Sequence, residues 1–271
     1  MDKRAKAIPA AWESLITKWL TSLLAGGASK QTARLRRAHL AKFARASSKN
    51  FEELKASDVA DYLAAQSWSR ETRRAAVASL KSFFKFVGAG RLLEGLPRVK
   101  PSVPAPRPAP SDIYELALAE AAPRERLMMR LAAELGLRRG EIARVNIADI
   151  GEDLLGSSLI VHGKGNKLRS VPLRGELARE LKARSGAGGW VFPGNDNGHL
   201  SADRVGKLIA AGLPGRWTAH TLRHRFATRA YGASDDLLAV SRLLGHASVA
   251  TTQRYVATDA ARLRKVASLA A

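Results

Sequence analysis

Apolar and polar positions in the first hundred residues recur with the spacing of surface helices. This spacing predicts one helix from about Pro9 to Leu24, ended by a glycine pair, and a second from about Lys30 to Ala46. Ser57 and Ser69 each precede a further periodic stretch, and we expect them to be the N-caps of two more helices. The pattern therefore predicts a helical first domain.

Beyond residue 110 the spacing changes twice. Ser111 is expected to cap a helix through about Ala121, and another helix is expected from about Arg124 to Leu135. Leu154–His162 and Leu168–Leu173 flank a Gly-Lys-Gly-Asn-Lys turn, which is typical of a β-hairpin. The remaining helices are expected after Gly175, near Ser201, and over Ala219–Tyr231, Ser234–Leu244, Ser248–Tyr255 and Thr258–Leu269. The predicted class is mainly α, with a small antiparallel sheet in an α+β second domain.

Six prolines fall within residues 97–110. Proline lacks the backbone N–H and interrupts both helices and central strands, so neither element continues through this stretch. We therefore expect a semi-rigid, extended linker between a helical domain, residues 1–96, and a second domain, residues 111–271.

Charge narrows the class of partner. The 271 residues include 45 Lys+Arg and 24 Asp+Glu, a formal net charge of +21, divided as +10 over residues 1–96 and +11 over the rest. Such an excess of positive charge indicates that the binding partner is a polyanion. A ribosomal protein is one alternative; a membrane partner is not expected, because no run of about 18 apolar residues occurs. The chain has no cysteine, which excludes disulfides, Cys zinc sites and a thiol nucleophile, and we expect a cytoplasmic protein.

Two predicted helices of the first domain carry basic stripes on a helical wheel. The basic positions are Lys30, Arg34, Arg37 and Arg45 in one helix, and Arg70, Arg74, Lys81 and Lys85 in the other. The separate apolar positions are Leu35, Leu40 and Phe43, and Ala76, Leu80, Phe83, Phe84 and Val87. A charged stripe is commonly a solvated face, but few acids are interleaved here, and this favours contact with DNA phosphates.

Six side chains of the second domain together offer a chemistry that breaks phosphodiesters. They are Arg138, Lys164, His220, Arg223, His246 and Tyr255. Such cleavage needs a nucleophile, cations for the non-bridging oxygens and a proton for the leaving oxygen. No His-X-His, HEXXH or Asp-X-Asp cluster occurs, so no metal site is predicted. Each residue alone also has an ordinary structural reading, such as a surface cation, a capping histidine or a partly buried tyrosine.

Four motifs surround these residues in a fixed order. Leu-Gly-Leu-Arg-X-X-Glu contains Arg138, and Gly-Lys-Gly-Asn-Lys contains Lys164. His-X-Leu-Arg-His contains His220 and Arg223, and Leu-Gly-His is followed by Tyr255 nine residues after its histidine. Together the motifs closely resemble the tyrosine recombinase family, also called phage integrases. The resemblance covers the whole second domain and has no departure at a catalytic position.

The resemblance implies a division of labour among these groups. Tyr255 would attack a DNA phosphate, form a 3′-phosphotyrosyl link and release a 5′-hydroxyl. Arg138 and Arg223 would hold the phosphate and stabilise the transition state with their planar guanidinium groups. Lys164 would protonate the leaving oxygen.

Three further residues complete the implied site. His220 would assist proton movement at the tyrosine, and His246 would donate to a non-bridging oxygen. Glu141 would orient this framework. The covalent link conserves the energy of the broken bond, so the resemblance implies no cofactor, no metal and no ATP.

The resemblance also implies partners. The two domains would hold double-stranded DNA between them at core attachment sites, with the basic stripes of the first domain facing the DNA. The protein would form a tetramer on synapsed DNA, in the nucleoid of a bacterial host cell. An accessory directionality factor would be a further partner. Residues 258–271 would pack on a neighbouring protomer or fold back on their own chain, and both arrangements stay open.

The predicted function is site-specific recombination, with several alternatives. Only about eight residues precede the first predicted helix, so we expect a minimal integrase without an arm-binding domain, of the kind found in some mycobacteriophages. It would integrate a phage genome into the host chromosome. The alternatives are an Xer-type resolvase of chromosome or plasmid dimers, a type IB topoisomerase, and a non-catalytic DNA-binding regulator on the same scaffold.

Overall fold

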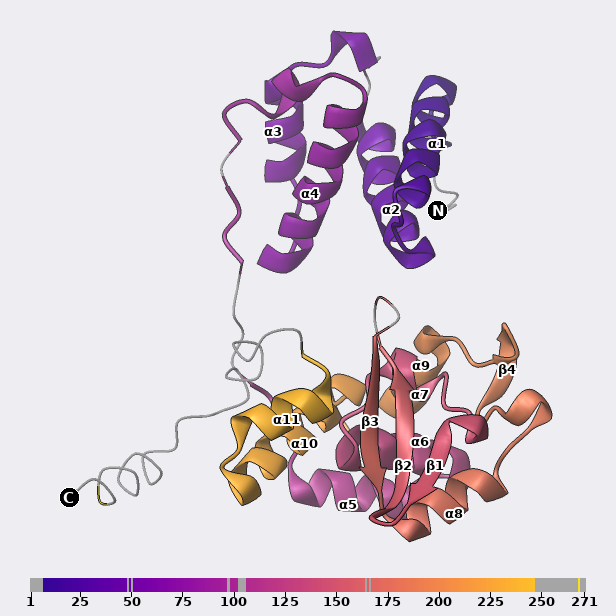
Figure 1. Ribbon diagram of the computed structural model, residues 1–271. Coiled ribbons are helices and arrows are strands. Elements are labelled where there is room, and N and C mark those ends of the chain that lie inside the picture. The colour runs from indigo at the N-terminus through magenta and orange to yellow at the C-terminus, as the bar shows by residue number, and fades with distance from the viewer. Residues whose placement is uncertain are drawn as a thin grey trace. The chain divides into compact units, whose positions relative to one another are not determined.

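The chain forms two compact units, Met1–Pro104 and Ala105–Ala271, called here the first and second units. The structure, a computed structural model, describes residues 7–47, 49, 51–96, 98–101, 106–163, 165, 167–246 and 268. Within these residues the chain is mostly helical and has one three-stranded antiparallel sheet (Figure 1). The predicted fold class is therefore confirmed.

Four helices pack around an aromatic core in the first unit. They are α1 (Ala10–Ala25), α2 (Lys30–Ala46), α3 (Ala56–Ala64) and α4 (Arg70–Phe86), with short 3₁₀ turns η1 (Phe51–Glu53) and η2 (Gly90–Leu93). Trp12 is buried at the centre, with its ring 5.6 Å from that of Phe43 and 5.9 Å from that of Phe83. Because such pairs contribute about 0.5–1.5 kcal/mol beyond area burial, these rings fix how α1, α2 and α4 meet.

Two details of the first unit differ from the sequence prediction. Ser69 caps α4 as expected, but Ser57 does not cap α3, which begins at Ala56. Lys55 is the N-cap instead, and the Asp58 carboxylate at N3 accepts the Lys55 N–H at 2.8 Å, which places the start of the helix ahead of Ser57. Leu35 was expected on the apolar face of α2 and is 51% exposed, because alanines and Phe43 fill the core-facing positions.

The second unit packs helices against the sheet. Its elements are α5 (Ser111–Glu120), α6 (Pro123–Glu134), α7 (Arg139–Ile142), η3 (Ile147–Asp149), β1 (Ile150–Asp153), β2 (Gly156–His162), β3 (Leu168–Leu173), α8 (Gly175–Ala183), η5 (Ala187–Gly189), β4 (Pro193–Asp196), α9 (Ala202–Ala211), α10 (Ala219–Ser234) and α11 (Leu237–Leu244). The predicted hairpin is confirmed as β2 and β3, with Leu159 opposite Val171, whereas β1 was not predicted. The expected cap Ser111 lies inside α5, where its hydroxyl accepts from Arg225 at 2.8 Å.

One face of the sheet is buried in the core of the second unit. Leu159, Val161, Val171 and Leu173 point inward and pack with residues of α6, α8, α9 and α10, while Ile160 on the other face is 42% exposed. Figure 1 shows α6 behind the strands and α8 below them, with α11 beside β3. The alternation of buried and exposed positions is what the sequence pattern of a half-buried strand predicts.

Residues 106–110, Pro-Arg-Pro-Ala-Pro, run along the start of α10. The backbone N–H of Arg107 donates to His224 Nδ1 at 3.1 Å, and that of Ala109 donates to the Thr221 carbonyl at 3.1 Å. The other three positions are prolines, so every backbone N–H of this segment binds α10.

Several predictions fall outside the described residues. They concern Lys164, Tyr255, the helix expected over Ser248–Tyr255, and nearly all of the segment from Thr258 onward. Among the helices that the structure describes, none has the length and apolar character needed to cross a membrane.

Candidate active site

Arg223 joins three parts of the second unit. It lies one turn into α10 and is 2% exposed. Its guanidinium donates to the Gly136 carbonyl, to the Leu244 carbonyl at 2.7 Å, and to His246 Nε2 at 2.9 Å. Buried guanidinium groups need such acceptors, so the ends of α6 and α11 are held against α10 at this point.

Glu141 is the buried carboxylate of the site. Arg138 approaches it from the N-cap of α7, with its backbone N–H 2.9 Å from Oε2 and Nη1 2.7 Å from Oε1. Arg169 of β3 adds two parallel bonds of 3.0 and 2.8 Å, and Arg223 Nη1 lies 3.8 Å away. Burial raises the pKa of Glu141, but the donors of Arg169 and Arg138 outweigh it and lower the pKa to about 2. This carboxylate is therefore ionised at any ordinary pH.

His246 follows α11 and is half-buried. A guanidinium only donates, so His246 Nε2 accepts from Arg223, and the hydrogen-bond network assigns the proton of this neutral ring to Nδ1. Burial, followed by the charges of Arg223 and Arg138, lowers the pKa of His246 to about 4. At neutral pH the ring is therefore uncharged and carries its proton on Nδ1.

Two glycines allow the close approaches on which this arrangement depends. Gly136 has φ +66°, and a Cβ there would lie 2.5 Å from Phe226 Cδ1 and 2.9 Å from Leu244 Cδ2. Gly245 has φ +62°, and its Cβ would lie 2.9 Å from Arg169 Nη1. The Gly245 carbonyl accepts from Arg138 Nη2 at 3.3 Å. The glycines of the Leu-Gly-Leu and Leu-Gly-His motifs therefore have a steric basis.

His220 lies at the exposed start of α10, one turn before His224. Its Nε2 is 2.9 Å from His224 Nε2. Desolvation lowers the pKa of His220, although the residue is exposed overall, and the positive charges of Arg223 and Arg138 lower it further. The structure thus brings together Arg138, Glu141, Arg223 and His246, with His220 in their electrostatic range.

Two residues of this site were missed by the sequence prediction. Arg169 shares the inward face of β3 with Val171 and Leu173 at two-residue spacing, and its Nε donates to the Leu243 carbonyl at 2.7 Å. A cation at an inward strand position predicts a buried carboxylate partner, which is a signal the sequence did contain. His224 lies four residues after His220, on the same helical face.

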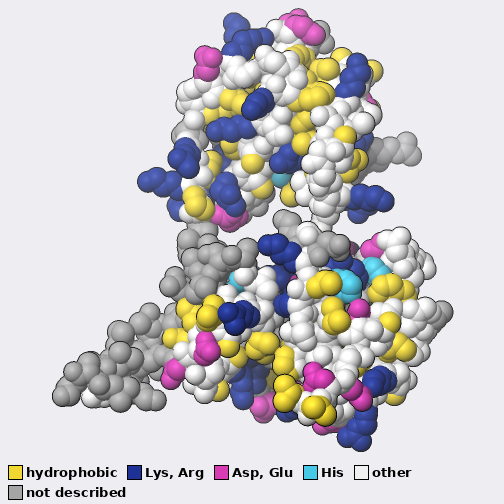
Figure 2. All heavy atoms as spheres, viewed as in Figure 1, with side chains coloured by type: hydrophobic (Ala, Val, Ile, Leu, Met, Phe, Trp, Pro, Cys, Tyr) yellow, Lys and Arg dark blue, Asp and Glu magenta, His cyan; other side chains and the backbone are white. Residues whose placement is uncertain are grey.

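The basic stripes predicted on the first unit are mostly exposed. Lys30, Arg34, Arg37, Arg70, Arg74, Lys81 and Lys85 are exposed, and Arg45 is half-buried. Arg37 is paired with Glu13, and Arg74 with Glu71 at 2.9 Å. Figure 2 shows Lys and Arg side chains spread over the visible surface of this unit, with few acidic ones between them.

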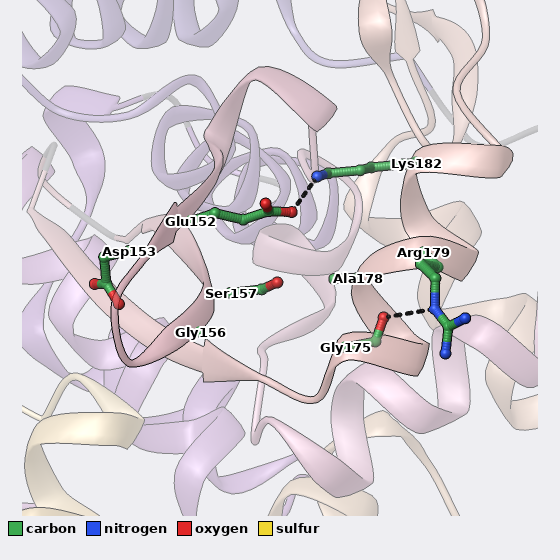
Figure 3. A pocket seen from close by; sticks show the side chains of 8 residues that line it. All are labelled: Glu152, Asp153, Gly156, Ser157, Gly175, Ala178, Arg179 and Lys182. Atoms are coloured by element: carbon green, nitrogen blue, oxygen red, sulfur yellow. Dashed lines mark hydrogen bonds and ion pairs between the residues drawn. The ribbon is translucent and has the colours of Figure 1, made fainter.

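A surface pocket lies elsewhere, between the β1–β2 turn and α8 (Figure 3). Its lining includes the Glu152–Lys182 ion pair, 2.6 Å long, and Arg179, which donates to the Gly175 carbonyl. It contains none of the predicted site residues and occupies the end of the sheet opposite the β2–β3 turn. Among the described residues, no three His, Cys, Asp or Glu side chains are grouped as metal ligands.

Comparisons with known proteins agree with this geometry. The phage integrase family matches residues 111–262. Tyrosine recombinase XerC of Rhodospirillum centenum is 34% identical over 221 residues, which cover 72% of this chain and 64% of the relative's own length. XerC of Bradyrhizobium diazoefficiens is 35% identical over 250 residues, covering 80% and 78% of the two chains.

The fold has solved counterparts too. XerH site-specific recombinase, bound to its palindromic difH substrate in a post-cleavage complex, superposes with a TM-score of 0.72 at 23% identity, covering 96% of this chain and 85% of XerH. At that identity the likeness concerns the fold alone. The family match and the XerC relatives carry the assignment: this chain belongs to the phage integrase family, the tyrosine recombinases.

Proposed function

We propose that this protein is a site-specific recombinase that cuts and rejoins DNA through a covalent link between Tyr255 and a 3′ phosphate. One observation carries the proposal. Arg138 and Arg223 both lie against the ionised Glu141, and His246 binds Arg223, so one connected framework fixes the positions of these three nitrogen-bearing side chains. Preorganised donors of this kind stabilise the charge that develops on a phosphate in the transition state.

The proposed step balances without further reactants. The Tyr255 oxygen bonds to phosphorus while the bond from phosphorus to the 5′ oxygen breaks. Lys164 gives a proton to that leaving oxygen, and Tyr255 gives its own proton to solvent water. The reverse reaction with the 5′-hydroxyl of a partner strand completes the exchange.

The partner is proposed to be double-stranded DNA, bound at short core sites by a tetramer. The family and the basic charge of both units support this. The XerC relatives favour resolution of chromosome or plasmid dimers as the cellular role, and integration of a phage genome is the second candidate. A nicked suicide DNA that carries either a chromosomal resolution site or a phage attachment site separates the two, because only the true site traps protein.

The nucleophile is tested by Tyr255→Phe. We expect the variant to bind its core site with unchanged affinity and to form no covalent adduct on a nicked suicide DNA. Tyr231→Phe, on α10, is the matched control and should retain the adduct. An adduct that persists in Tyr255→Phe, or wild-type relaxation of supercoils without any recombination, would overturn the assignment.

The basic stripes are tested by the salt dependence of binding. Arg34→Ala and Arg74→Ala should each weaken binding to all sequences and reduce the slope of log affinity against log salt by about one. Lys49→Ala is the control, because Lys49 lies off the stripes and pairs with Asp58 at 2.8 Å. Slopes equal to the wild type in both stripe variants would mean that these faces do not contact phosphates.

A further inference from the structure

His224 stands between the proline-rich segment and His220. On one side its Nδ1 is 3.1 Å from the backbone nitrogen of Arg107, and on the other its Nε2 is 2.9 Å from His220 Nε2. The two imidazole rings are 4.2 Å apart between centroids and inclined at 68°. A continuous chain of hydrogen bonds therefore runs from the backbone of residue 107 to a predicted site residue.

The direction of every bond in this chain follows from its first member. A backbone N–H is only a donor, so His224 Nδ1 has no proton and accepts. The neutral ring of His224 then carries its proton on Nε2 and donates it to His220. His220 Nε2 must accept, which leaves the proton of His220 on Nδ1. One N–H of the main chain thus sets the tautomer of a histidine two steps away.

The same chain opposes a positive charge on His220. If His220 took up a proton on Nε2, that N–H would point at the Nε2–H of His224, and one hydrogen bond would become a contact between two donors. Desolvation and the charges of Arg223 and Arg138 act in the same direction, because they lower the pKa of His220. Desolvation and the proximity of His220 lower the pKa of His224 to about 4, which keeps the relaying ring neutral as well.

We propose that His224, fixed by the backbone N–H of Arg107, is a positioning residue that holds His220 neutral with its proton on Nδ1. This inference rests on the proposed function: His220 then meets the scissile phosphate as a hydrogen-bond donor and does not take a proton from Tyr255. The role differs from the proton movement that the family resemblance suggested for His220.

The segment that supplies the N–H is itself well anchored. The Arg107 guanidinium lies 4.5 Å from the ring centroid of Trp217, and the Ala109 N–H binds the Thr221 carbonyl at 3.1 Å. The first contact is made by residue 107 itself and the second by the residue two positions later, and together they hold residue 107 in place. The hydrogen-bond chain is therefore part of the folded unit and does not depend on bound DNA.

The tautomers are measured directly by two-bond ¹H–¹⁵N correlation NMR of the full chain with ¹⁵N-labelled histidine. The six histidines are assigned by single substitution. We expect a bare Nε2 and a protonated Nδ1 for His220, and the opposite for His224. A proton on Nε2 of His220 would overturn the proposal.

A pair of substitutions isolates the backbone donor. Arg107→Pro removes the N–H, and proline suits the extended Pro-Arg-Pro context, whereas Arg107→Ala keeps the N–H and removes only the guanidinium. We expect Arg107→Pro to release both rings into mixed tautomers and Arg107→Ala to leave the wild-type pattern. The wild-type pattern in Arg107→Pro would refute the role of the segment.

Catalysis gives a second readout. His224→Leu should lower the rate of covalent adduct formation about tenfold, equivalent to one hydrogen bond worth roughly 1.4 kcal/mol, without changing DNA affinity. His224→Gln restores a side-chain N–H donor and should recover most of the rate. Equal losses in both variants would indicate a merely structural histidine and contradict the proposal.

The two proposals fail in different ways. The tautomers are read without DNA, so their predicted pattern can hold in a protein that forms no adduct, and the proposed function alone would then fall. An active enzyme with the opposite tautomers would instead remove only the role of His224.

Discussion

Replacing Glu141 by glutamine removes the one negative charge that Arg138, Arg169 and Arg223 share. The side chain is 2% exposed, so water does little to screen the loss. A pKa lowered from 4.5 to about 2 corresponds to roughly 3 kcal/mol of stabilisation at neutral pH. Removing one partner of a buried ion pair typically costs about 3–5 kcal/mol, which agrees. At about 2–4 °C per kcal/mol for a unit of this size, we expect Tm to fall by roughly 6–12 °C.

The pKa of Glu141 also predicts in which direction its contribution to stability changes with pH. The folded pKa of Glu141 is depressed, so its contribution to stability is complete above the unfolded value of 4.5 and is lost as the pH falls toward 2. The stability gap between the wild type and Glu141→Gln should therefore be constant near neutrality. It should narrow steadily as the pH falls from about 4.5 to about 2, because the carboxylate of the unfolded wild-type chain takes up protons in this range while that of the folded chain stays ionised.

Calorimetry of the full chain measures Tm, and hydrogen exchange of peptides from β2 and β3 identifies which transition belongs to the second unit. Glu152→Gln is the matched control. Its carboxylate pairs with Lys182 on the surface and is 64% exposed, so Tm should not change. Equal Tm values for the wild type and Glu141→Gln at pH 7, or a gap that stays constant down to pH 2, would refute the argument.

Two further predictions concern the backbone at Gly136 and the imidazole of His246. Gly136→Ala should destabilise the second unit by more than about 1 kcal/mol, because it adds a clash with Phe226 to the strain of a positive φ. Gly215→Ala has a similar φ of +70° but open space, so urea denaturation should show a clearly smaller loss; equal losses would exclude the clash. His246 has a folded pKa of about 4 against 6.5, so its contribution is complete above about pH 6.5 and is lost toward pH 4. His246→Gln should flatten the stability profile in that window, and an unchanged profile would contradict this.

Local signals predicted the helices well, because their boundaries depend on neighbouring residues. The helix expected over Lys30–Ala46 has those bounds, and Ser69 caps α4. The error at Ser57 arose because the Asp58 carboxylate binds the Lys55 N–H, so that the helix begins ahead of Ser57. Leu35 was misplaced because a helical wheel shows which residues share a face of the helix, but it does not show which face packs against a neighbouring helix.

The candidate site was predictable as a set of residues, but its connections were not. Arg169 and Glu141 are 28 residues apart, and nothing in the local sequence pairs that arginine with that carboxylate. The hydrogen bond between residue 107 and His224 spans 117 positions. Such contacts come from the packing of β3 and α10 in the folded unit, which periodicity and motif order do not encode. The roles of Lys164 and Tyr255 stay predictions.

The alternation of proline in residues 106–110 has a consequence for register. Only positions 107 and 109 have an N–H, and both N–H groups are used on α10. A slip of one residue would present proline nitrogens to both acceptors, so the two bonds would be lost together. The segment can therefore bind α10 only with positions 107 and 109 facing the two acceptors. No backbone N–H remains that could pair with a β-strand of another protein. Insertions before Pro106 leave both N–H groups opposite their acceptors on α10, whereas adding or deleting one residue within the segment destroys this alignment.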